Sequence, residues 1–285
     1  MTSARRARRI ATRAAYGGGV GVAGIGALGV LGYGVVRVEK AIAHRVVGRP
    51  FEGAPDDNGC YGTGGGDVLD LVMLGDSTAA GLGNDRADQS IGARIAAEVA
   101  DVRGAPVRLT NVAVVGATSA DLGVQVANVL DEVRRPAVAV ILIGANDITH
   151  RVGAAVAAAH LADAVTRLSA TGAHVVVGTC PDLGTIRPIP QPLRLLVRRW
   201  SRELAAAQAV AVAAAGGSVV ALGDLIGPEF AQSPAEMFSA DRFHPSPAGY
   251  ARAAAVLLPA VGAALGLPAQ QLPVPADVPS ETYGV

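Results

Sequence analysis

Residues 68–77 read VLDLVMLGDS, a short apolar run that ends abruptly in Gly-Asp-Ser. The run is partly β-branched and bounded by glycine, which predicts a buried strand. Open α/β sheets hold their active sites just past the carboxyl ends of the strands. Ser77 is therefore a candidate to present its hydroxyl in such a crevice; the alternative is a serine that caps the next helix.

Strands and helices alternate from residue 67 onward, which predicts a parallel sheet covered on both faces. We expect strands at 68–74, 107–114, 137–143, 174–180 and 218–222. We expect helices at about 88–101, 119–133, 151–170, 193–215 and 246–265. The fold class is therefore α/β.

Two distant stretches supply the partners that a reactive serine needs. The apolar run at 137–143 ends in Gly144-Ala145-Asn146-Asp147, and DRFHP stands at 241–245. Serine is a poor nucleophile without a base, and His244 is the obvious base. Asp241, three residues earlier, can orient the imidazole and stabilise its charged form. The alternatives are a turn residue for Asp241 and an ordinary loop histidine for His244.

Taken together and in this order, the blocks resemble those of the SGNH (GDSL) hydrolase family. The family's Gly-Asp-Ser, Gly-x-Asn-Asp and Asp-x-x-His blocks match residues 75–77, 144–147 and 241–244, and its remaining glycine block best matches Gly116. The resemblance covers about residues 67–267. It implies a three-layer α/β/α sandwich, flavodoxin-like, with a five-stranded parallel sheet.

The resemblance also implies the roles of the site residues. Ser77, Asp241 and His244 would form a catalytic triad, and the oxyanion hole would take donors from Ser77, Gly116 and Asn146. Gly116 departs from the family pattern, which often has Asn-x-Gly here, because four residues separate it from Asn111. A tight turn is the alternative for that glycine. No metal-ligand cluster is present in the sequence, so we expect neither a metal nor another cofactor.

The first 36 residues have the pattern of a membrane-targeting segment. Residues 1–13 form a basic leader with five arginines, and residues 14–36 are uncharged for 23 positions, enough to span a bilayer. We interpret 14–36 as a signal anchor or signal peptide rather than a disordered leader. The chain would then be membrane-anchored or secreted, with its catalytic domain outside the cytoplasm. The G-x-G-x-x-G at 24–29 follows arginines rather than a strand, so it does not indicate dinucleotide binding.

The remaining organisation follows from glycine and proline. We expect a linker at 37–66, the hydrolase domain at 67–267 and a proline-spaced tail at 268–285. Residues 181–192 carry four prolines and should lie on the rim of the active site. The basic stretch at 193–200 is either an ordinary amphipathic helix or a rim element that meets a membrane surface.

Composition excludes several classes of protein. The formal net charge is zero, so nothing indicates a nucleic-acid surface. The two cysteines, Cys60 and Cys180, lack zinc-site spacing. They are either free thiols or, in an exported domain, a disulfide.

We therefore predict a serine esterase that hydrolyses small to medium acyl esters through an acyl-enzyme. We expect acyl groups of this size because no insertion in the sequence is long enough to build a lid. Its partner would be a small-molecule or cell-envelope acyl ester. The alternatives are a deacetylase of envelope sugars, a lipase, a thioesterase or a non-catalytic binding module. The sequence leaves the oligomeric state open.

Overall fold

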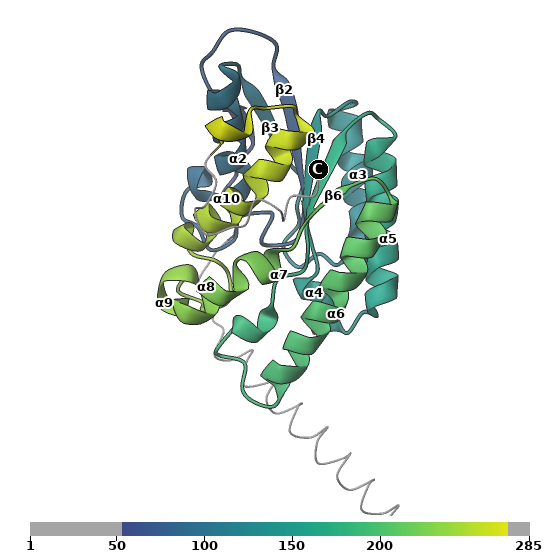
Figure 1. Ribbon diagram of the computed structural model, residues 1–285, viewed down its shortest axis with the longest axis vertical. Coiled ribbons are helices and arrows are strands. Elements are labelled where there is room, and N and C mark those ends of the chain that lie inside the picture. The colour runs from purple at the N-terminus through teal and green to yellow at the C-terminus, as the bar shows by residue number, and fades with distance from the viewer. Residues whose placement is uncertain (1–52, 273–285) are drawn as a thin grey trace, which may run out of the picture.

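A computed structural model describes residues 53–272, which form a mixed sheet between two layers of helices (Figure 1). The six strands are β1 (Gly59–Tyr61), β2 (Leu69–Gly75), β3 (Val107–Asn111), β4 (Val138–Leu142), β5 (His174–Gly178) and β6 (Ser218–Val220). The longer helices are α2 (Ile91–Arg103), α3 (Leu122–Glu132), α5 (Ala154–Ser169), α6 (Leu193–Ala214) and α10 (Pro247–Ala264). This arrangement is the predicted α/β/α sandwich.

The central strand β2 is buried on both faces, as its apolar run predicts. Leu71 and Met73 point into the core shared with α2 and α10, whereas Val72 and Leu74 point into the core shared with α3 and α5. All four side chains are fully buried. The alternation of side chains along a strand therefore assigns the two helical layers to opposite faces.

The strand order creates a crevice next to β2. The order across the sheet is β1-β3-β2-β4-β5-β6, and β2 to β6 are parallel. From β2 the chain therefore passes to β3 on one side of β2, and then crosses to β4 on the other side of β2. Ligands of open α/β sheets bind where the order reverses in this way. The loops after β2 and β4 leave the sheet on the two sides of that point.

The sheet has one strand more than the sequence predicts. The five expected parallel strands are present, and β1 adds an antiparallel edge strand beside β3. It lies inside the segment 37–66 that the sequence analysis assigns to a linker. Three residues reading GCY carry no periodic pattern, so only pairing with β3 defines them as a strand.

The short helices were also not predicted, because each is too brief to show an apolar period. They are α4 (Ala145–His150), α7 (Leu222–Leu225), α8 (Gly227–Gln232) and α9 (Pro234–Met237). Short 3-10 turns include η2 (Ser119–Asp121) and η3 (Leu183–Thr185). The turn η3 lies in the proline-containing rim segment 181–192, directly after the β5 strand.

Several expectations concern residues that the structure does not describe. The leader 1–13, the apolar segment 14–36, most of the linker and most of the tail lie outside residues 53–272. Within the described range, no helix combines the length and apolarity needed to cross a membrane. Both cysteines are described and both are free: Cys60 is exposed on β1 and Cys180 is buried. The disulfide alternative is therefore not observed.

Candidate active site

Ser77 lies in a sharp turn directly after β2. The preceding Gly75 has φ 139° and sits against the backbone of β4, so that a Cβ there would lie 1.9 Å from the carbonyl oxygen of Leu142. Only glycine fits both the close approach and the positive φ. The N–H of Asp76 donates to the same carbonyl at 3.0 Å. The turn is thereby locked to β4, the strand whose following loop leads to Asn146.

Ser77, His244 and Asp241 form one hydrogen-bonded line. The Oγ of Ser77 lies 3.0 Å from Nε2 of His244, and Nδ1 of His244 lies 2.5 Å from Oδ2 of Asp241. The serine and the histidine are 167 positions apart in the chain. The tertiary structure therefore brings together the three residues that the sequence analysis names as a triad.

The loop before α10 holds Asp241 rigidly. Its second oxygen, Oδ1, accepts hydrogen bonds from the N–H groups of Phe243 and His244 and from the hydroxyl of Ser239, each at 2.9 Å. Arg242 adopts φ 56°, which turns the chain so that these donors converge. Burial raises the pKa of Asp241, but the hydrogen bonds from His244 and the backbone outweigh it and leave the pKa below its usual value. The group is thus a carboxylate at neutral pH.

Asn146 reaches the loop that follows β3. It lies in the first turn of α4, and its Nδ2 donates to the carbonyl of Ala117 at 3.0 Å. The next residue, Asp147, accepts from the N–H and the hydroxyl of Ser119 in the same loop. These bonds tie the loop after β4 to the loop that contains Gly116.

Gly116 itself is exposed and has φ 88°, in the region that favours glycine. A Cβ there would meet nothing within 4 Å, so the backbone conformation rather than crowding explains a glycine. Among the described residues, no hydrogen bond joins Gly116 to Ser77, Asn146, Asp241 or His244. Asn146 approaches it only through the neighbouring Ala117.

Two buried glutamines hold the strand ends from which these loops depart, and neither was predicted from the sequence. Gln125 of α3 accepts from the N–H of Gly75 at 2.8 Å and donates to its carbonyl at 2.9 Å. Gln208 of α6 donates to the carbonyl of Ile143 at 2.9 Å and accepts from the N–H of Cys180 at 2.7 Å. Their position on the apolar side of a helix could have indicated this role, because a buried amide needs hydrogen-bond partners.

A third link connects the serine turn to β3. Asn111 donates to the carbonyl of Ala79 at 3.0 Å and to Oδ1 of Asp57 at 2.9 Å, and accepts from the N–H of Ala113. Asp57 is buried and also accepts from the hydroxyl of Ser90. The turn after Ser77 is therefore fixed from β3 as well as from β4.

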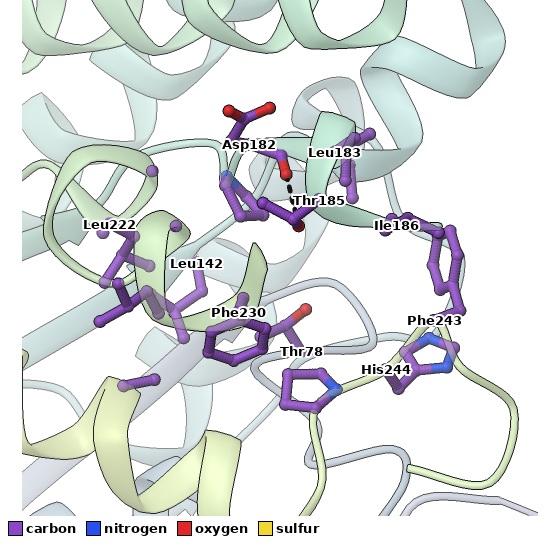
Figure 2. A pocket seen from close by; sticks show the side chains of 18 of the residues that line it. Thr78, Leu142, Asp182, Leu183, Thr185, Ile186, Leu222, Phe230, Phe243 and His244 are labelled. Carbon is purple, nitrogen blue, oxygen red and sulfur yellow. Dashed lines mark hydrogen bonds between the residues drawn. The ribbon is translucent and has the colours of Figure 1, made fainter. Parts of the chain in front are cut away.

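An apolar pocket opens beside Ser77 and His244 (Figure 2). Its walls come from the ends of β4 and β5, from η3, α7 and α8, and from the loop that carries Phe243 and His244. Figure 2 shows Phe243 next to His244, and their rings meet edge to face at 5.0 Å between centroids. The site thus combines a hydrogen-bonded serine with an adjacent space for an apolar group.

Asp76 is the ionisable group of the site that burial affects most clearly. Burial raises its pKa from 3.8 to about 6, against lowering contributions from the N–H of Thr78 and from His244. The folded protein therefore keeps this proton to a higher pH than the unfolded chain. Stability is lost as pH rises from about 4 to about 6, and one pKa unit corresponds to about 1.4 kcal/mol.

We expect the stability of Asp76→Asn relative to the wild type to rise by up to about 3 kcal/mol between pH 4 and values above pH 6. The asparagine oxygen can still accept from Thr78, but the variant has no buried charge to desolvate. The advantage should shrink toward pH 4, as measured by urea unfolding across that range. Asp131→Asn, at an exposed position of α3, controls for the change in net charge. A pH-independent difference between Asp76→Asn and the wild type would contradict this account.

Solved structures share this architecture. The structure of TesA is 28% identical, with TM-score 0.54, and the match covers 69% of this chain and 98% of that one. A lipase/acylhydrolase from Enterococcus faecalis has TM-score 0.54 at 22% identity, over 70% of this chain and 97% of that one. The second likeness concerns the fold alone. Fold and site together define a hydrolase of the SGNH type.

Sequence comparison specifies the family. The model of the GDSL-like Lipase/Acylhydrolase family matches residues 73–252, and the chain belongs to this family. The GDSL-like esterase Rv1075c of Mycobacterium tuberculosis is 46% identical over 233 residues, 78% of this chain and 74% of that protein. The chain is thus an ester-bond hydrolase, a GDSL-like esterase.

Proposed function

We propose that this protein is a serine esterase in which Ser77 is the nucleophile, His244 the general base and Asp241 the group that orients the base. The observation that carries the proposal is the continuous line Oγ–Nε2 and Nδ1–Oδ2, with separations of 3.0 and 2.5 Å. A nucleophile, a base and an orienting acceptor at hydrogen-bond distance are what activation of a serine requires.

The proposed reaction has two halves. His244 takes the proton of Ser77 as the hydroxyl attacks the ester carbonyl, and Asp241 stabilises the resulting imidazolium. The alcohol leaves with that proton, which gives an acyl-enzyme. Water, deprotonated by His244, then attacks the acyl-enzyme, and His244 returns the proton to Oγ of Ser77 as the acid leaves. The mechanism needs no metal or other cofactor.

We assign stabilisation of the oxyanion to the N–H groups of Ser77 and Gly116 and to the side chain of Asn146. An amide nitrogen carries two N–H groups, and the bond to Ala117 uses one of them. The other remains for the oxyanion. The same bond holds the side chain beside the loop of Gly116.

Labelling with a fluorophosphonate tests the proposal, because only an activated hydroxyl reacts quickly. We expect the wild type to label once, at Ser77, and to hydrolyse p-nitrophenyl esters of small and medium acids. Ser77→Ala should lose both properties, whereas Ser169→Ala, on the far end of α5, should keep them. A folded wild type that neither labels nor hydrolyses any ester in a panel that includes acetylated glycans would indicate a binding module.

Asn146→Ala is expected to lower kcat by about 10²–10³-fold with little change in KM, because it removes a donor that acts mainly in the transition state. Steady-state kinetics on a butyryl ester measures this. Ser77 should still label with fluorophosphonate in the variant, only more slowly. A rise in KM with unchanged kcat would mean that Asn146 binds substrate uniformly, and its oxyanion role would be wrong.

We further propose that residues 1–36 direct the domain out of the cytoplasm, on the basis of the arginine-flanked apolar segment. Residues 1–60 fused to alkaline phosphatase should give an active reporter in a bacterial host, because this enzyme matures only outside the cytoplasm. The same fusion without residues 14–36 is the control. An inactive, fully cytosolic reporter in the complete fusion would refute the proposal.

A further inference from the structure

The pocket beside Ser77 is lined by hydrocarbon over most of its wall. The rim elements that follow β5 and β6 supply much of this lining, with empty space of about 820 Å³ when the part open to solvent is counted. The side chains that enclose it are Leu142, Leu183, Ile186, Leu222, Ile226 and Phe230. All six side chains are buried, so the pocket extends into the hydrophobic core.

Two polar side chains of this wall, Thr185 and Asp182, are already hydrogen-bonded within the protein. The hydroxyl of Thr185 donates to the carbonyl of Asp182 at 2.8 Å, the bond drawn in Figure 2. The carboxylate of Asp182 accepts from Nε of Arg198 at 3.0 Å and from the N–H of Gly184 at 2.8 Å. These groups leave little hydrogen-bonding capacity for the hydroxyls of a sugar. An aliphatic chain needs none and gains from burial.

Leu142 and Leu222 close the inner end of the pocket. A Cβ on Gly178 would lie 2.4 Å from Cδ2 of Leu142 and 2.7 Å from Cδ1 of Leu222, so the two side chains meet over the bare backbone of that glycine. In Figure 2 both leucines lie on the side away from His244 and Phe243, with Phe230 between. The pocket therefore opens beside the catalytic residues, and its inner end, formed by Leu142 and Leu222, is apolar. We call this inner end the floor.

The sheet register gives the depth. Gly75 pairs with Leu142, and Leu142 pairs with Gly178, so Gly178, over which the two floor side chains meet, lies two strands from the end of β2. Two strand spacings are about 10 Å. An extended chain advances about 1.2 Å per single bond, since a residue of three bonds spans 3.3–3.6 Å. The distance thus accommodates about eight bonds, far more than an acetyl group uses.

We propose that this pocket holds the acyl chain of the substrate, that the substrates are esters of medium-chain fatty acids between butyrate and about octanoate, and that Leu222 sets the upper limit. The inference rests on the proposed function, because it takes the acyl carbon to be attached to Ser77. An acetyl ester would leave the pocket largely empty. A palmitoyl chain is longer than the pocket is deep, so its far end would have to bend back out of the pocket.

The test compares kcat/KM on p-nitrophenyl acetate, butyrate, octanoate, dodecanoate and palmitate for the full chain and three variants. Leu222→Ala deepens the floor and should raise the dodecanoate-to-butyrate ratio at least about 10-fold, because one methylene in an apolar pocket changes specificity by about 10–200-fold. Leu222→Val should shift the ratio less, in the same direction. Leu161→Ala removes an equally buried leucine on the opposite face of the sheet and should leave the ratio unchanged.

The outcomes separate this inference from the proposed function. A wild type that fluorophosphonate does not label at Ser77 would refute the esterase mechanism. Normal labelling with acetate or palmitate as the best substrate would refute the pocket assignment alone. An unchanged ratio in folded Leu222→Ala would do the same. If Leu222→Ala does not fold by circular dichroism, Leu222→Val decides: a shift toward dodecanoate supports the inference and an unchanged ratio overturns it.

Discussion

Ser77→Ala and His244→Ala are each expected to reduce kcat by roughly 10⁴- to 10⁶-fold, and the double variant should lose no more than either single one. The serine needs the imidazole at Nε2 to give up its proton, and the imidazole has no other use without the serine. Groups that act as one unit show such non-additive losses. Kinetics on a butyryl ester at high enzyme concentration measures the residual rates.

The structure offers a control for this pair. His174 begins β5 on an exposed position, so His174→Ala should keep wild-type kinetics while changing the histidine content equally. Near-normal esterase activity in Ser77→Ala would refute the whole mechanism. Losses that add in the double variant would mean that His244 contributes through a route other than Ser77.

Asp241→Asn is expected to lower kcat by about 10⁴-fold with the fold intact, the size of loss reported for the equivalent change in a serine protease. One oxygen of Asp241 accepts from Ser239 and two backbone N–H groups, and the asparagine oxygen can continue to do so. The amide nitrogen then faces Nδ1 of His244 and donates to it. The imidazole is thereby held in the tautomer whose Nε2 carries a proton and cannot accept one from Ser77.

Asp241→Ala distinguishes orientation of the base from organisation of the loop. It removes the acceptor for all three loop donors, so both activity and thermal stability should fall, whereas Asp241→Asn should lose activity with little change in melting temperature. Circular dichroism melts and butyryl-ester kinetics on both variants provide the comparison. If Asp241→Asn unfolds as readily as Asp241→Ala, the residue serves the loop more than the imidazole.

Local patterns in the sequence were sufficient for the main elements. The strands β2, β4 and β5 in the apolar runs are buried on both faces over most of their length. Hydrophobic burial acts on each segment independently of its distant partners. The motifs that begin at Gly75, Gly144 and Asp241 could also be recognised in the sequence, because each combines a polar group with the glycine or turn residue that its loop requires. Their resemblance to one family then gave the fold.

Elements without a local pattern could not be found this way. The strand β1 exists through pairing with β3, and α7 and α8 are shorter than two turns of helix. The pocket depends on α7 and α8, so its floor at Leu222 was not visible in the sequence. The sequence supported small to medium acyl esters only from the lack of a lid-sized insertion.

What the sequence by itself determined is therefore the chemistry present: a hydroxyl at Ser77, an imidazole at His244, a carboxylate at Asp241 and the strands that carry them. Only the tertiary structure decided that Oγ and Nε2 stand 3.0 Å apart. That distance depends on the strand order around β2 and on the buried amides of Gln125 and Gln208, which satisfy backbone groups at the ends of three strands. These are contacts between residues far apart in the chain, and no local pattern encodes them.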